Sequence, residues 1–426
     1  MHSTTRFARL KSLRSTAAGL ALAIALAGGA SLGLTGLTAT PAAAQEQQQP
    51  SAGFAAVYQE LATMVQPETA DFAGAQARIP QLLAAVENNR DRDLAGNLVL
   101  NIGTNVDDRQ LQRQGLMLRL ESGLVPAEQV GQFNWFVGSL SYDFDEWATA
   151  RQYMMVAQER GFSPEGNDLV QLIAQTYMEE EQPQQALDYL TAQIAAADAA
   201  GTPVNERWLL AGLQTAYDYD LSEPALAMAE RVVRDYPTET NWRNALQIVS
   251  QMYDLDNQAR VDLYRLMFLK NTLDERQDTT RYIEDLDPRI MANEVQRVLA
   301  RGVETGAFTS SDPYYTEVRG IVEARAGGER SGVRQTIADA RSGDALDAVG
   351  AGDVLLSVED YAQAEELFAL ALQRGADADM ANTRIGIAQA QQGKYAEALA
   401  TFGQVSGNRA PIARMWTVYV NERMGS

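Results

Sequence analysis

The sequence has no cysteine and a single histidine, His2, among its 426 residues. Without cysteine the chain has no disulfide and no thiol nucleophile. Once His2 is removed with the N-terminal segment described below, zinc sites built on His and Cys, Ser/His/Asp triads and haem ligation through His are excluded too. Lysine is almost as rare: beyond residue 11 only Lys270 and Lys394 occur, and neither follows a glycine-rich phosphate loop. The chemistry left for catalysis is that of carboxylates, as glycosidases use it.

Strand patterns are also lacking. Strict alternation of apolar and polar residues is nearly absent, and β-branched residues are scattered. We therefore expect the whole mature chain to be all-α.

The first 44 residues differ from the rest of the chain. Four basic residues and no acidic one precede an uncharged run rich in Ala, Leu and Gly, which includes Leu20–Leu26. Ala42 and Ala44 then fit the small-residue rule of a cleavage site, so the pattern predicts a secretory signal peptide cleaved after Ala44. An uncleaved anchor is the alternative, because the uncharged stretch Ser15–Gln45 is long enough to span a bilayer.

The rest of the chain is strongly acidic. Removal of the signal's four basic residues lowers the basic count from 35 to 31, against 56 acidic residues, a net charge of −25. Such a body is a poor candidate for binding nucleic acid or an anionic membrane surface. Solubility alone would explain the acidity equally well.

A repeat is visible near the C-terminus. The segment Tyr361–Phe368 aligns with Tyr395–Phe402 at a separation of 34 residues, with Tyr on Tyr, Ala on Ala and Phe on Phe, and Gly352 aligns with Gly386 at the same separation. A 34-residue period with small residues at fixed points is typical of stacked helix-turn-helix units. The sequence therefore resembles the tetratricopeptide repeat (TPR) family.

The resemblance implies a right-handed superhelical solenoid whose first helices line a concave groove. In that family the groove holds a partner peptide or helix, and no cofactor or metal is implied. Amide and aromatic side chains suit this task, because amides both donate to and accept from a peptide backbone. With the register uncertain by one position in the later units, the expected groove residues are Trp135, Tyr142, Gln171, Gln175, Arg243, Gln247 and Gln251. Trp135 and Tyr142 are expected to be its aromatic anchors.

The register is clear in some segments and loose in others, which leaves open one array or two arrays joined by a looser helical segment. The expected order is a signal peptide (1–44), a flexible lead (45–52), degenerate or capping repeats (53–127), a TPR-like array (128–270), an irregular helical segment (271–344), and a C-terminal repeat pair with a capping helix (345–426).

Two details of the later segments can be predicted. Asp312-Pro313 begins a helix that should run to about Arg325, where Gly327-Gly328 is expected to break it. The apolar residues of Ile412–Met424 recur at helical spacing, which predicts a helix covering the last repeat.

The motif Tyr-Asp-x-Asp occurs three times and ends with Asp145, Asp220 and Asp256. Paired carboxylates could bind calcium or act as an acid and a base. A helix-capping role is favoured, because the last Asp of each motif lies just before the next expected helix and no EF-hand spacing surrounds any of them.

These observations favour a non-enzymatic protein-interaction scaffold, placed in the periplasm or outside the cell by the signal and the resemblance together. Two alternatives stay open. One is a membrane-tethered assembly factor for an envelope or polysaccharide-export complex, which an uncleaved N-terminus would favour. The other is a carboxylate-dependent hydrolase on a helical-repeat frame, although no Asp/Glu pair sits in an evident cleft.

Overall fold

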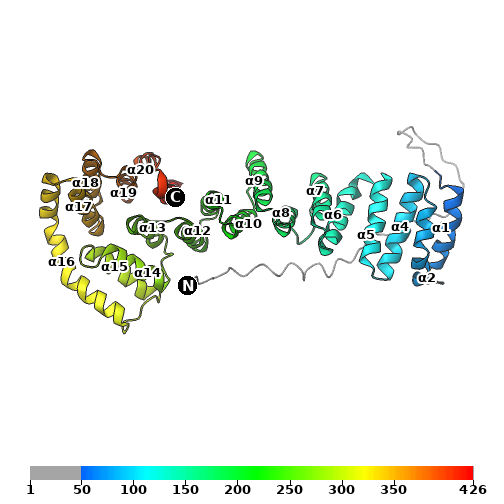
Figure 1. The fold of residues 1–426 in the computed structure, drawn as a ribbon, viewed down its shortest axis with the longest axis horizontal. Helices are drawn as coiled ribbons and strands as arrows, with labels where there is room; N and C mark the ends of the chain where they lie inside the picture. The colour runs from blue at the N-terminus through cyan, green and yellow to red at the C-terminus, as the bar shows by residue number, and fades with distance from the viewer. Residues whose placement is uncertain (1–48, 426) are drawn as a thin grey trace. The chain divides into compact units, whose positions relative to one another are not determined.

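The computed structural model describes residues 49–425, and the predicted signal peptide and residues 45–48 of the predicted lead lie outside them. Every regular element among these residues is a helix, which confirms the all-α prediction for them (Figure 1). The chain divides between Glu181 and Gln182 into two compact units, called unit 1 and unit 2 below.

Unit 1 is a stack of helices whose first three short members pack against α4. Their shared core contains Phe54, Leu61, Leu82 and Val99, all fully buried. The helices of unit 1 are α1 (Ala52–Met64), α2 (Phe72–Ala77), α3 (Ile79–Ala84), α4 (Asn89–Asn105), α5 (Arg109–Ser122), α6 (Ala127–Asp143), α7 (Trp147–Glu159) and α8 (Leu169–Glu179).

Unit 2 curls until its last helix, α21, packs against α11, α12 and α13 (Figure 1). The boundary between the two units lies within the predicted array 128–270. The contacts of α21 join the second half of that array to the C-terminal repeats. The helices of unit 2 are α9 (Pro183–Ala199), α10 (Glu206–Asp218), α11 (Ser222–Asp235), α12 (Glu239–Met252), α13 (Asn257–Leu269), α14 (Arg276–Leu286), α15 (Ala292–Glu304), α16 (Pro313–Ser342), α17 (Ala345–Ser357), α18 (Tyr361–Gln373), α19 (Ala378–Gln391), α20 (Tyr395–Phe402) and α21 (Ala410–Gly425), with a 3₁₀ turn, Gly407–Arg409, before the last.

The same left-handed turn joins the two helices of several pairs. Asp145, Asp220, Glu359 and Gly393 all have φ between 55° and 76°. In each turn the next residue's N–H donates to a carbonyl five residues back, at 2.8–3.0 Å. This is the Schellman arrangement, which satisfies carbonyls that a helix end leaves unpaired.

These turns correct two of the three predicted caps. Asp145 and Asp220 occupy the left-handed position itself, and the N-caps of α7 and α11 are the next residues, Glu146 and Leu221. The prediction failed because a turn that needs positive φ takes Asp readily. Only Asp256 caps as predicted: its side chain accepts from Ala259 N at 2.7 Å.

The glycines of the 34-residue repeat make room for its phenylalanines. A Cβ placed on Gly352 would lie 2.6 Å from the Phe368 ring, and one on Gly386 would lie 2.5 Å from the Phe402 ring. Both rings are buried. The repeated glycine and phenylalanine are thus two halves of one packing contact between paired helices.

Helix α16 contradicts the predicted break. It continues through Gly327-Gly328 for 30 residues, although each interior glycine costs about 1 kcal/mol relative to alanine. Packing outweighs this cost, because α16 contacts both α15 and α17. The Asn293 side chain also donates to Ala326 O at 3.0 Å and to Glu329 Oε2 at 2.7 Å, next to the glycine pair.

Candidate functional site

Trp135, predicted as an aromatic anchor, is only 3% exposed. It lies on α6 within a run of six consecutive buried residues, Phe133–Gly138, because α5 and α7 both pack against this helix. Trp135 therefore stabilises unit 1 and offers a partner almost no surface, which corrects its predicted role. Tyr142 is half-buried and makes an edge-to-face contact with Trp147, with ring centroids 4.9 Å apart.

The predicted groove residues Gln171 and Gln175 lie one turn apart on α8, and both are partly exposed. The backbone N–H of Gln171 donates to the capping Asp168, and the Gln175 side chain donates to Glu179 at 2.8 Å. Both amides belong to unit 1, whereas the remaining predicted residues belong to unit 2.

The predicted residues of unit 2 are Arg243, Gln247 and Gln251, which follow one another at four-residue spacing along α12. Together with Tyr217 of α10 they are called the polar strip below. The Tyr217 hydroxyl donates to Gln251 Oε1 at 2.6 Å, across one 34-residue repeat. Arg243 bonds Asp274 through Nε and Nη2, at 3.2 and 2.7 Å. Gln247 is half-buried and Gln251 is exposed. The strip is therefore at least partly accessible. Neighbouring side chains hold Tyr217, Arg243 and Gln251 in place.

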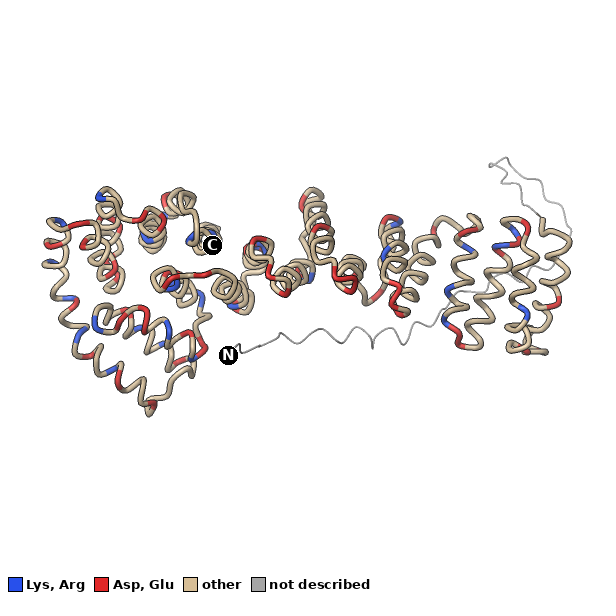
Figure 2. Tube along the Cα trace, viewed as in Figure 1, with Lys and Arg blue, Asp and Glu red and all other residues tan. Residues whose placement is uncertain are grey.

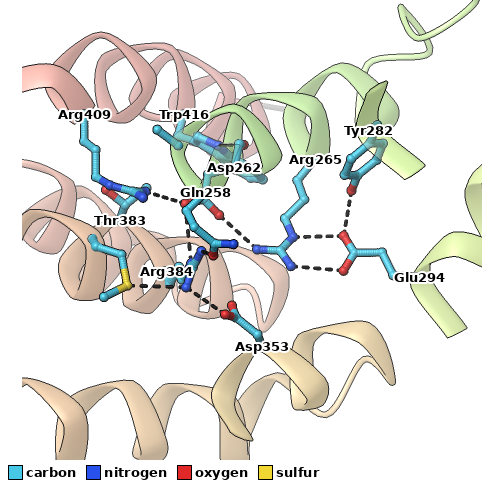
Figure 3. Close-up of polar contacts among 12 residues, drawn as sticks. Gln258, Asp262, Arg265, Tyr282, Glu294, Asp353, Thr383, Arg384, Arg409 and Trp416 are labelled. Atoms are coloured by element: carbon cyan, nitrogen blue, oxygen red, sulfur yellow. Dashed lines mark hydrogen bonds and ion pairs between the residues drawn. The ribbon is translucent and has the colours of Figure 1, made fainter. Parts of the chain in front are cut away.

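The interior of unit 2 contains charged residues that sequence reasoning missed. Six of them form the interior charge network, and each is at most 8% exposed. They come from α13, α15, α17, α19 and the turn before α21, elements that meet inside the curled unit (Figure 3). The network consists of Asp262, Arg265, Glu294, Asp353, Arg384 and Arg409.

Asp262 is the centre of the network and is fully buried. Its carboxylate accepts from Arg265 Nη1 at 2.9 Å and from Arg409 Nη1 at 2.6 Å, and it lies 3.5 Å from Arg384 Nε (Figure 3). Its main-chain oxygen accepts from the Trp416 indole at 3.0 Å. One residue of α13 thus binds three elements that are distant in sequence.

Glu294 is the second acceptor. Arg265 donates to both of its oxygens, at 2.9 and 3.0 Å, and the Tyr282 hydroxyl donates to it at 2.6 Å (Figure 3). The Glu294 backbone N–H donates to Ser357 Oγ at 3.0 Å. Such paired, planar contacts are the geometry in which a buried guanidinium and carboxylate stabilise each other best.

Burial opposes ionisation of every carboxyl group in this network, but with different outcomes. For Asp262, three guanidinium groups outweigh the burial and hold its pKa below the ordinary value. Arg265 and the Tyr282 hydroxyl do the same for the pKa of Glu294.

Asp353 is the exception, because burial raises its pKa above the ordinary value despite Arg384. One oxygen of Asp353 accepts from Arg384 Nη1 at 2.8 Å, whereas Oδ1 has no hydrogen-bond partner among the described residues. With all three carboxylates ionised, the network's three positive and three negative charges balance. Asp353 is the member whose charge is least compensated.

A pocket opens at one end of this interior, with a volume of about 70 Å³. Its walls are mostly carbon, and its floor includes the Arg265–Glu294 pair. Partly exposed polar groups stand at its rim: Arg297, Glu359, Tyr361 and Gln391. The apolar wall residues are Phe268, Leu269, Val298, Leu356, Ile387 and Trp416.

The sequence carried one signal of this network: Asp353 in α17 and Arg384 in α19 are the charged residues beyond the first turn of their helices. Their pairing could not be read from the sequence, because Arg384 and Arg409 meet Asp262 across more than 120 positions. Among the described residues, no group of three or more His, Cys, Asp and Glu side chains is arranged to hold a metal ion. Within that same range, no helix has both the length and the apolarity needed to cross a bilayer.

No protein-family model and no curated protein matches the chain. Among solved structures, it is similar to yeast Tom70, with 11% identity over 88% of this chain and 97% of that one and a TM-score of 0.20. It is also similar to a chain of the Naa15/Naa10 structure bound to HypK-THB, with 11% identity over 87% of this chain and 73% of that one and a TM-score of 0.24. TM-scores this low say nothing of function. The TPR-like character of the solenoid rests on its repeated turns and glycine–phenylalanine contacts.

Proposed function

We propose that this chain is a non-enzymatic scaffold that binds a segment of a partner protein along the polar strip of α10 and α12. The observation that carries the proposal is the accessible set Tyr217, Arg243, Gln247 and Gln251, in which Tyr217 bonds Gln251 and Arg243 bonds Asp274. Because Tyr217, Arg243 and Gln251 already make these hydrogen bonds, binding a peptide would order few further side chains and so would cost little conformational entropy.

The charges of the chain favour a basic or neutral partner. Within each unit, basic residues are interspersed with acidic ones (Figure 2), and the chain carries a net charge of −21. An acidic surface attracts a basic segment, and this attraction weakens as salt rises. Association should therefore become slower at high salt.

The same reasoning weighs against the hydrolase alternative. The carboxylates with the most strongly altered environments lie in the interior charge network, and Asp262 and Glu294 there are saturated by guanidinium and hydroxyl donors. A general acid or base must instead reach the substrate. The polar strip has accessible side chains and the network does not, which favours binding over catalysis.

We further propose export to the periplasm or the cell exterior, on the basis of the signal-like N-terminus. Retention of that segment would instead tether the scaffold to a membrane, as the envelope-assembly alternative requires.

The test begins with affinity capture from an envelope extract, followed by binding measurements with the purified partner. A variant carrying Gln247→Ala and Gln251→Ala should bind about tenfold more weakly, since each lost amide contact costs about 0.5–1.5 kcal/mol. Arg234→Ala, an exposed substitution on α11, is the control and should change nothing. If the double variant folds, as judged by circular dichroism, and binds as tightly as the original chain, the polar strip is not the binding surface.

A further inference from the structure

The interior pocket of unit 2 has the features of a site for one side chain. About 70 Å³ is far below the roughly 300–1,000 Å³ of small-molecule and cofactor sites. A cavity of about 150 Å³ can hold a benzene ring. The pocket has less than half of that volume, so we expect aromatic anchors to be too large as well. Side chains of the size of valine, leucine, isoleucine or methionine remain.

The charges around the pocket exclude a charged anchor. Arg265 and Arg297 stand against Glu294 and Glu359, so the charged lining residues balance. Arg265 and Glu294 bind each other, and Glu359 lies 3.4 Å from Arg297 Nε. A lysine or aspartate entering the pocket would lose its hydration without meeting an unbalanced opposite charge, which is costly. An uncharged aliphatic side chain would lie against the carbon walls and against polar groups that already bind one another.

The rim can hold the backbone that carries such a side chain. A peptide unit offers one donor and one acceptor. The Gln391 amide can supply both kinds of partner, and Glu359, whose side chain is 53% exposed, can accept. Arg297 donates through Nη1 to Ser357 O at 2.8 Å, which fixes its guanidinium beside the opening. The polar rim therefore suits a polypeptide better than a free hydrocarbon.

We infer that this pocket binds a single uncharged aliphatic or methionine side chain of a partner polypeptide, with the adjoining peptide groups held by Gln391 and Glu359. The inference rests on the proposed scaffold function and adds a second point of contact to the polar strip.

The experiment uses methyl NMR of the full mature chain with N-acetyl-L-leucine amide as the probe. Methyl signals of Leu269, Val298, Leu356 and Ile387 should shift saturably. The lysine and tryptophan analogues of the probe should bind at least fivefold more weakly. These comparisons test the predicted charge and size limits without any partner protein.

Leu269→Trp is designed to close the opening from the surface, because Leu269 is 36% exposed. Val303→Trp is the matched control: Val303 is 39% exposed on α15 and does not line the pocket. Binding of the leucine probe should be lost in Leu269→Trp and kept in Val303→Trp. No saturable shift in the original chain, or equal binding by both variants, would overturn the inference. The polar-strip variants test the scaffold role without using the pocket, so the two failures are distinguishable.

Discussion

Arg409 donates to the carboxylate of Asp262 at 2.6 Å, across 147 positions of sequence. Because Arg265 and Arg384 approach the same carboxylate, its removal would leave three buried guanidinium groups poorly compensated. Asp262→Ala should therefore destabilise unit 2 by about 3–5 kcal/mol, the usual effect of breaking a buried ion pair. Hydrogen exchange of unit 2 amides can measure this without assuming that both units unfold together. Asp254 is exposed, so Asp254→Ala is the control and should leave the stability of unit 2 nearly unchanged. A similar loss of stability in both variants would contradict a central role for Asp262.

The network also predicts loss of stability in acid. The folded-state pKa values of Asp262 and Glu294 lie below their ordinary values, because guanidinium groups outweigh the burial. Their contribution is fully present above the unfolded pKa of about 4 and is lost as pH falls through the folded values. The melting temperature of unit 2 should therefore fall steeply below about pH 4. A flat profile between pH 5 and 3 would contradict this.

Asp353 should respond to pH in the opposite direction. Burial raises its folded-state pKa, so the folded chain binds its proton more tightly than the unfolded chain does. The resulting stability is present at low pH and is lost as pH rises through the folded value. Asp353→Asn removes this titration, so its stability relative to the original chain should increase between pH 4 and 7. Thermal melts of both proteins across that range would show it, and a constant difference would argue against it.

The left-handed turns can be tested by glycine substitution. Asp145→Gly and Asp220→Gly should preserve or raise stability, whereas valine at either position should cost about 1–2 kcal/mol. Asp256 should behave differently, because it is a cap: Asp256→Ala should cost about 0.5–2 kcal/mol. Melting temperatures of these five variants, and of Asp145→Ala and Asp220→Ala, would decide. Equal losses from alanine at all three aspartates would favour the capping role that the sequence first suggested.

The glycine–phenylalanine contacts predict opposite effects of alanine at two positions of α17. Gly352→Ala should cost about 1–3 kcal/mol, because the new Cβ would overlap the Phe368 ring. A Cβ at Gly350 would have nothing within 4 Å, so Gly350→Ala should gain up to about 1 kcal/mol from helix propensity. Chemical denaturation measures both. Should the two substitutions have the same sign, the packing argument fails.

Cleavage of the N-terminal segment can be tested by intact-mass measurement of the protein recovered from cells. Release after Ala44 should leave a chain beginning at Gln45. Finding the first 44 residues still attached would favour the membrane-tethered alternative.

The sequence predicted local features better than distant ones. The helix over Ile412–Met424 was predicted from periodicity within one segment, and it is present as α21. Trp135 was misplaced because α5 and α7 pack against α6 and bury every residue from Phe133 to Gly138, so this part of the helix has no exposed face. The continuous α16 was missed because the packing that supports Gly327-Gly328 comes from other helices.

The interior charge network of unit 2 could not be predicted from local periodicity, for a related reason. A solenoid's repeats are expected to contact their neighbours only, and nothing in the local pattern says that a superhelix will close. No local sequence pattern around Asp262 or Arg384 identifies the distant residue that each one binds. Their pairing depends on how far every intervening repeat rotates the chain.

Closure of unit 2 has a consequence for the order in which the chain can fold. Contacts that are distant in sequence slow folding, because a long loop must close before they stabilise anything. Helix α13 is synthesised well before Arg409 and Trp416, so Asp262 has neither partner until the final helix leaves the ribosome. Unit 1, built from neighbouring helices, can complete its core during synthesis. Unit 2 cannot complete its interior charge network until Arg409 and Trp416 have been synthesised.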